Sequence, residues 1–189
     1  AGGMRNAGIH RARAQILRSK GDDAGAMAEL GRALQIDPRD SAALRARGRQ
    51  HFHSGRFEAA EQDFAAAYAI TASGFEVIWL ALARMNRGLE ASGALTDGLA
   101  KQKEREWPAP VMLHLSGSMD REALLAAAAH ADPEKQRSQV CEARFYAAQR
   151  LLLERRAPEA RPLLEAAAKE CPSNYVEYEA AKVELAKLP

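Results

Sequence analysis

Apolar and small residues recur along this chain at the spacing of amphipathic helices. In the segments 6–18 and 24–36 they fall three or four positions apart, which predicts two helices with one apolar side each. A turn at Gly21 separates the two segments. Pro38 ends the second one, because proline cannot donate a hydrogen bond to the preceding turn. The pattern therefore predicts a helical hairpin.

The same hairpin pattern returns after 34 residues, with helices expected at 41–54 and 57–71. Four small or apolar landmarks keep this spacing, as Gly21 and Gly55, Ala26 and Ala60, Leu30 and Phe64, and Ala33 and Ala67. A hairpin of this kind cannot bury its apolar side alone, so successive hairpins are expected to stack. The period predicts a repeat protein.

The pattern weakens in a third repeat and is then interrupted. A helix is expected at 75–87, whereas the next helix, at 91–105, keeps few landmarks of the repeat. A short helix ending near residue 115 follows, and then a helix at 119–130. Ser118 is the expected N-cap of that helix, because a serine hydroxyl can accept from the first turn.

A fourth regular repeat and a final helix close the chain. With Cys141 as its first position, small and apolar residues again occupy the expected places, and Pro172 ends the repeat. The helix at 173–187 is expected to cover the apolar side of this last repeat as a cap. Its charged residues are expected to form a solvated outer face, namely Glu177, Glu179, Lys182, Glu184 and Lys187.

A period of 34 residues with these landmarks resembles the tetratricopeptide repeat (TPR) family. The resemblance implies an all-α fold, an α-α solenoid of the TPR type that winds as a right-handed superhelix and ends in a capping helix. We expect one domain over residues 1–189, with repeats at about 7–40 and 41–74, a degenerate repeat at 75–137, a fourth repeat at 138–172 and a cap at 173–188. The family resemblance also implies a non-catalytic scaffold that holds another polypeptide in a concave groove.

The C-terminal half also resembles the bacterial lipoprotein family typified by NlpI. The motifs that carry this resemblance are Trp107 with His114-Leu115-Ser116-Gly117, the run Cys141-Glu142-Ala143-Arg144-Phe145-Tyr146, and Tyr175-Val176-Glu177-Tyr178. The family implies an envelope-associated scaffold, often a homodimer, that recruits peptidoglycan hydrolases or a protease. Its lipoprotein signal and lipidated cysteine do not occur in this sequence. A periplasmic location is thus favoured by resemblance, and a cytoplasmic one stays open.

In the TPR family, the first helices of the repeats line the groove, mainly at positions two, five, nine and twelve. The polar and aromatic residues at matching positions here are Arg11, Gln15, Arg18, Arg45, Arg49, Phe52, Trp79 and Asn86. Guanidinium groups bind carboxylates at two points, and the two aromatic rings can anchor apolar side chains. A partner segment with acidic and apolar residues is therefore expected. The competing interpretation is a merely solvated arginine face on alanine-rich helices.

The two cysteines, Cys141 and Cys171, are expected at the same end of the fourth helical hairpin. Their α carbons can therefore lie within the roughly 4.4–6.8 Å that a disulfide tolerates. A bridge that closes about thirty residues would stabilise the fold by roughly 3–4 kcal/mol and would favour an oxidising compartment. The alternative is a pair of reduced, buried thiols.

Composition narrows the remaining classes of function. The chain is 47% hydrophobic and 28% charged, so disorder is not expected, and no apolar run has the length of a membrane span. Residues 1–60 carry eleven Lys and Arg against six Asp and Glu. This basic half suggests nucleic acid as a partner, but interspersed acidic residues and few aromatic residues disfavour it.

No catalytic or cofactor-binding motif stands out in the sequence. His51 and His53 are two positions apart, which turns them to different sides of a helix and disfavours a shared metal ion. Glycine-rich phosphate loops and nucleophile elbows are absent from the sequence. We therefore expect no enzyme activity, no cofactor and no metal site. An accessory module of a larger enzyme is kept as an alternative.

Overall fold

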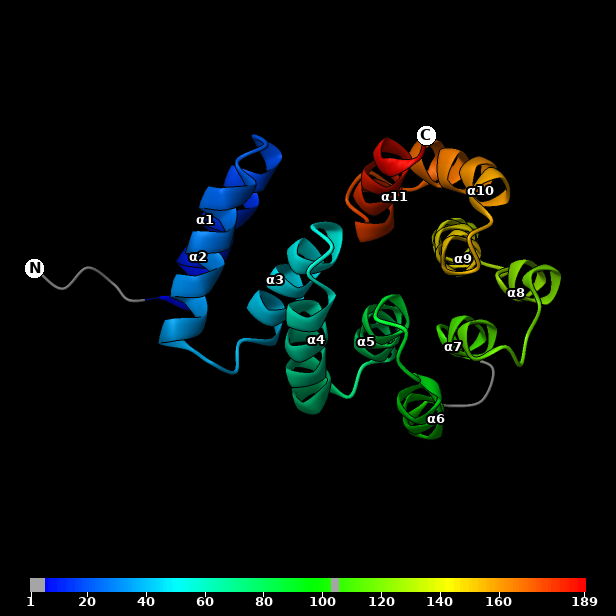
Figure 1. The fold of residues 1–189 in the computed structure, drawn as a ribbon, viewed down its shortest axis with the longest axis horizontal. Helices are drawn as coiled ribbons and strands as arrows, with labels where there is room; N and C mark the ends of the chain where they lie inside the picture. Colours follow the sequence, from blue (N-terminus) through cyan, green and yellow to red (C-terminus); the bar gives the residue numbers. More distant parts are fainter. Residues whose placement is uncertain (1–5, 103–105) are drawn as a thin grey trace, which may run out of the picture. The chain divides into compact units, whose positions relative to one another are not determined.

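The computed structural model describes residues 6–102 and 106–189 (Figure 1). These residues form eleven α-helices and no β-strand. The chain divides into two compact units, an N-terminal unit, Ala1–Leu89, and a C-terminal unit, Glu90–Pro189.

The N-terminal unit is a series of antiparallel helices. Its helices are α1 (Ala7–Ser19), α2 (Asp23–Ile36), α3 (Ser41–His53), α4 (Phe57–Thr71) and α5 (Gly74–Asn86). The pairs α1 with α2 and α3 with α4 are the first two predicted hairpins, and α5 packs against α4. Short polar side chains cap several of these helices. Asp22 accepts from the backbone amide of Gly25, and Asp40 accepts from that of Ala43.

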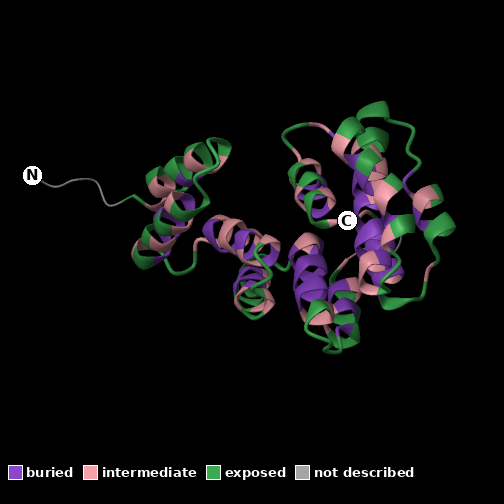
Figure 2. Ribbon diagram, turned by 45° about the horizontal axis from the view of Figure 1, so that its top comes forward, coloured by how far each residue is buried: buried purple, intermediate pink, exposed green. Residues whose placement is uncertain are grey.

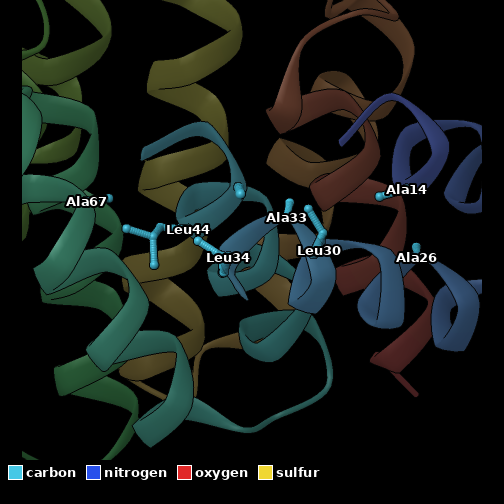
Figure 3. Close-up of a cluster of buried hydrophobic side chains, with 8 residues drawn as sticks. Ala14, Ala26, Leu30, Ala33, Leu34, Leu44 and Ala67 are labelled. Atoms are coloured by element: carbon cyan, nitrogen blue, oxygen red, sulfur yellow. The ribbon is translucent and has the colours of Figure 1, made fainter. Parts of the chain in front are cut away.

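Small residues let the helices of this unit approach closely. One core cluster joins α1, α2, α3 and α4 through Ala14, Ala26, Leu30, Ala33, Leu34, Ala43, Leu44 and Ala67 (Figure 3). In the second hairpin, a Cβ atom added to Gly48 would lie 3.0 Å from Cε1 of Phe64. The landmarks Ala26, Leu30 and Ala33 of the 34-residue period are therefore residues that make helix contacts.

The C-terminal unit begins irregularly and ends in a regular hairpin. Its helices are α6 (Ser92–Lys101), α7 (Ala109–Ser116), α8 (Arg121–Ala127), α9 (Pro133–Leu153), α10 (Ala157–Glu170) and α11 (Val176–Lys187). Helices α9 and α10 form the predicted fourth repeat, and α11 packs against both of them as the cap. Much of α9 is buried, as Figure 2 shows by its purple ribbon.

Several predicted helix boundaries are wrong in this unit. Helix α9 begins at Pro133, well before Cys141, because Asp132 caps it and proline fits the first turn. The predicted N-cap Ser118 does not cap α8. Asp120 does so instead, accepting from the amide of Ala123 at 2.7 Å. The cap helix begins at residue 176 rather than 173, and the predicted end of the helix at 91–105 lies outside the described residues.

The turn that joins the two helices of a hairpin carries a different residue type in the two units. Gly21 and Gly55 join the helices of the first two hairpins with φ angles of 79° and 73°. In the fourth repeat, Arg155 occupies the corresponding turn with a φ of 60°. This left-handed conformation favours glycine, because a Cβ atom crowds the backbone there.

The predicted fold class, an all-α α-α solenoid with a C-terminal capping helix, is confirmed. Neither the single domain nor the handedness of the superhelix is tested, and both stay predictions. No helix in the described segments has both the length and the apolar character required to span a bilayer.

Candidate functional site

Two of the predicted groove arginines connect successive repeats. Nε of Arg11 lies 2.7 Å from Oδ2 of Asp40, the N-cap of α3. Nη1 of Arg45 lies 3.1 Å from Oε1 of Glu76, in the first turn of α5. The arginine at the fifth position of each repeat thus meets an acidic residue at the start of the next repeat. Both arginine side chains are 42% exposed.

The remaining polar residues of the prediction continue the same sides of α1 and α3. Arg11, Gln15 and Arg18 follow one another at intervals of four and three residues, and Arg45 and Arg49 are four apart, so each set shares a helix side. Gln15 is exposed, and Arg18 and Arg49 are half-buried. We call these five residues the basic face. Arg18 has no ion-pair partner in the part of the chain that the structure describes.

Asn86 stands apart from the basic face near the end of α5. Its side chain is exposed, and Nδ2 donates to the carbonyl oxygen of Leu82 at 2.8 Å. This bond is made within α5 itself.

The predicted aromatic anchors, Phe52 and Trp79, are core residues, which corrects the sequence interpretation. They are only 2% and 3% exposed. Their rings meet edge to face with centroids 5.2 Å apart, and Trp79 also stacks on Phe64 at 5.8 Å. Burying such large rings between helices stabilises the fold more than exposing them would. Neither ring is presented to a partner.

Other charged side chains of the N-terminal unit form ion pairs between neighbouring helices. Arg47 donates two hydrogen bonds to Asp63, at 2.8 and 2.6 Å, and this contact raises the pKa of the Arg47 guanidinium. Glu61 of α4 accepts from Arg84 of α5 at 2.8 Å and also pairs with Arg87. These ion pairs hold the packed helices in register.

The two cysteines lie together at one end of the α9–α10 hairpin. The α carbons of Cys141 and Cys171 are 5.1 Å apart, and a disulfide joins them. Of the two alternatives that the sequence left open, the structure contains the bridged one. The bridge ties the end of α10 to the middle of α9.

Two buried carboxylates occupy the core of the C-terminal unit. Nε1 of Trp107 donates to Oε2 of Glu142, and the hydroxyl of Tyr146 donates to Oε1 of Glu177 at 2.9 Å. Burial raises the pKa of Glu142 to about 8, with a further contribution from the charge of Glu177, whereas the Trp107 hydrogen bond acts in the opposite direction.

These contacts correct the prediction of a fully solvated outer face on the cap helix, because Glu177 and Glu184 are both buried. Sequence reasoning also missed the burial of Glu142. The sequence did contain a signal for Glu142 and Glu177, since each lies within a run of small, apolar and aromatic residues.

A polar cleft of about 470 Å³ lies among α7, α8 and α9. Three of its charged lining residues form an ion-pair cluster. Glu154 accepts from both Arg150 and Arg156 at 3.0 Å. On the same cleft, Nδ1 of His114 lies 3.0 Å from the carbonyl oxygen of Met119, and burial lowers the pKa of this histidine. The two arginines that line the cleft beside Glu154 are therefore already paired with a carboxylate.

His51 and His53, weighed as metal ligands in the sequence, are not brought together on one ion. His51 lies 3.9 Å from Asp63, and its burial lowers the pKa of the imidazole. Within the described ranges, no three His, Cys, Asp or Glu side chains are grouped as metal ligands.

Comparison with known proteins found a structural likeness but no match in sequence. A scan against protein-family models found no match, and a search of curated proteins found none. Among solved structures, the chain is similar to one described as "Crystal structure of MamA protein", with 19% identity and a TM-score of 0.49, over 97% of this chain and 98% of that chain. At this level the likeness assigns neither a partner nor an activity.

Proposed function

We propose that this protein is a non-catalytic scaffold whose basic face binds an acidic segment of a partner polypeptide. The proposal rests on the ion pairing and the exposure of Arg11 and Arg45. Each guanidinium is held by a neighbouring carboxylate and is still 42% exposed. Arg18 adds a cation with no ion-pair partner among the described side chains.

The chemistry of arginine suits this role. A guanidinium has five N–H donors, and one carboxylate uses at most two of them. The remaining donors of Arg11 and Arg45 can bind a second carboxylate, supplied by a partner. Because Asp40 and Glu76 already hold these side chains in place, binding immobilises less rotational freedom. Since Phe52 and Trp79 are buried, the acidic residues of the partner define the recognition.

An oxidising compartment is part of the proposal, on two grounds. The C-terminal motifs resemble the NlpI-type envelope lipoproteins, and the Cys141–Cys171 bridge is of a kind that persists outside reducing cytoplasm. We propose a scaffold in the bacterial periplasm or cell envelope, with a homodimer as the family resemblance implies. Locating the native protein in fractionated cells would test this part.

The structure shows how the basic face must be tested. Charge reversal at Arg45 would place a carboxylate beside the buried Glu76 and would damage the fold. The combined change R18Q/R45Q/E76Q removes two cations without leaving that carboxylate unpaired. R39Q, at an exposed loop residue, has the same net charge and is the matched control.

Binding would be measured by fluorescence anisotropy with labelled peptides that combine acidic and apolar residues, and with lysine-substituted versions of them. We expect R18Q/R45Q/E76Q to bind the acidic peptides about tenfold more weakly, while R39Q binds as the wild type does. Circular dichroism would check that both variants stay helical. Equal binding by all three proteins would exclude the basic face. Salt-sensitive binding of arbitrary DNA would favour the nucleic-acid alternative.

A further inference from the structure

The side of α1 that faces away from α2 carries two exposed isoleucines. Ile9 and Ile16 are 37% and 54% exposed, respectively, and lie two turns apart on one side of the helix. Ala14, on the opposite side, belongs to the core shared with α2. Large apolar side chains aligned in this way on a helix are typical of a docking surface.

The later repeats show that the position of Ile9 is buried when another helix packs in front of it. Ile9 corresponds, at the 34-residue period, to Ala43 in α3 and Val77 in α5, and both of those residues are fully buried. Ala43 belongs to the core cluster with Leu30 and Leu34 of α2. Helix α2 packs against α3, and α4 packs against α5. In the second and third repeats, therefore, the preceding helix covers the side that is exposed on α1.

The exposed side of α1 is also positively charged. Helix α1 contains no acidic residue. Arg13 and Lys20 lie on the isoleucine side, are exposed, and form no ion pair within the described part of the chain. Arg47, which corresponds to Arg13, is bound by Asp63. In the first repeat, the acid at that place is Glu29, and it is held by His10 and Arg32 instead.

The N-terminal unit contains an example of a covering helix that meets cations. Helix α4 covers α5 and supplies Glu61, which pairs with Arg84 of α5 and with Arg87 just after its end. The covering helix thus brings an apolar side chain, Phe64, against Trp79 and a carboxylate to the cations. A helix with the same combination would suit α1.

We propose that the isoleucine side of α1 binds an amphipathic helix of a partner protein that carries acidic residues beside apolar ones. We call this surface the α1 stripe, and its residues are Ile9, Ala12, Arg13, Ile16 and Lys20. It is separate from the basic face, because Arg11, Gln15 and Arg18 point to other sides of α1. The isoleucines supply apolar contact area, and the two cations select the acidic helix.

The probe is a helix that the molecule itself provides. A labelled, hydrocarbon-stapled peptide with the sequence of residues 56–72 reproduces α4, including Glu58, Glu61 and Asp63, in a preformed helix. A second peptide carries Gln or Asn at these three positions. Both would be titrated with the full chain, and binding would be followed by fluorescence anisotropy at low and high salt.

We expect the acidic peptide to bind and the neutral peptide to bind more weakly. The variant I9Q/I16Q should lose at least about tenfold in affinity, because burying an isoleucine contributes a factor of this order. R13Q/K20Q should weaken binding and reduce its dependence on salt. R18Q/R45Q/E76Q, which alters the basic face, should bind this peptide normally, so the two surfaces are tested separately.

Three results would overturn this proposal. One is failure of the stapled acidic peptide to bind, and another is binding that I9Q/I16Q leaves unchanged. The third is concentration-dependent self-association in sedimentation experiments that disappears in I9Q/I16Q, since the occupant would then be a second copy of this chain. Circular dichroism of I9Q/I16Q should match the wild type, because both side chains are exposed.

Discussion

The two units stabilise the same kind of helical hairpin through different contacts. In the N-terminal unit, polar contacts between helices are ion pairs with partly exposed arginines, such as Arg45 with Glu76. In the C-terminal unit, the fourth repeat is closed by a disulfide, and its carboxylates Glu142 and Glu177 are buried against an indole and a phenol. Buried carboxylates of the N-terminal unit are thus met by arginines, whereas those of the C-terminal unit are met by neutral hydrogen-bond donors.

This difference separates regions available for recognition from regions committed to stability. A half-exposed guanidinium can hold a neighbouring helix and still bind a carboxylate from solution. A buried glutamate that already accepts from a tyrosine hydroxyl has no such second role. The comparison therefore agrees with the proposal of partner binding by the N-terminal unit, and it predicts sensitivity to oxidation state and pH in the C-terminal unit.

The largest expected effect follows from removing the disulfide. C141S/C171S should lower the free energy of unfolding of the C-terminal unit by about 3–4 kcal/mol, because a loop of thirty residues regains its freedom in the unfolded chain. Hydrogen exchange would measure this in α9 and α10. Amides of α3, in a unit without cysteine, provide the internal control. Two free thiols in the denatured, unreduced wild type would contradict the prediction.

The next effect is a loss of stability of the C-terminal unit as the pH rises. The pKa of Glu142 is raised to about 8 from 4.5, so folding favours its protonated form. Stability from this group is complete below pH 4.5 and is lost as the pH rises to about 8. We expect a loss of about 2–3 kcal/mol, less than the full pKa separation allows, because Glu142 is not fully enclosed.

The variant E142Q separates this effect from other titrations. Glutamine stays neutral and can still accept from Trp107, so the variant should be more stable than the wild type at pH 8 and should lose the slope. Urea unfolding followed by exchange in α9 would measure it between pH 5 and pH 9. A wild type whose C-terminal unit is equally stable at both ends of this range would refute the assignment.

A third prediction concerns the ion pairs of the N-terminal unit. R45A should lower the free energy of unfolding of that unit by about 1–2 kcal/mol, because the buried carboxylate of Glu76 loses its partner. R45Q/E76Q should cost less, since no unpaired charge remains. Chemical unfolding would compare both with R156A, which breaks only exposed ion pairs in the C-terminal unit and should change little. Equal effects of R45A and R156A would remove the distinction between the two.

The regular repeats could be predicted from sequence because their landmarks are contact residues. Gly48 has to be small because Phe64 occupies the space beside it, and this requirement is local enough to recur every 34 residues. Whether Phe52 is buried depends on which side of α3 the next helix covers. An aromatic residue at a groove position could therefore not be recognised as a core residue from the sequence. The packing of α5, which brings Trp79 against Phe52, decides it.

The candidate site was predictable in composition but not in its contacts. The arginines of the basic face are at the expected positions, whereas their pairing with Asp40 and Glu76 depends on how successive repeats are offset. Glu177 was expected at the surface because a glutamate is usually solvated. Its burial depends on Tyr146, a residue of another helix. The α1 stripe was missed because exposed isoleucines at helical spacing look the same as core residues in a sequence.

The smallest expected effects on stability concern the turns that join the two helices of a hairpin. G55A should lower the free energy of unfolding of the N-terminal unit by about 1 kcal/mol, because the left-handed φ of 73° disfavours a Cβ atom. R155G should stabilise the C-terminal unit by about half as much, since relief of the same strain at a φ of 60° is partly offset by the greater freedom of glycine in the unfolded chain. Urea unfolding of the single variants would measure both signs. If R155G destabilises its unit, then contacts of the Arg155 side chain outweigh the strain of its backbone, and the fourth repeat does not share the turn requirement of the first two.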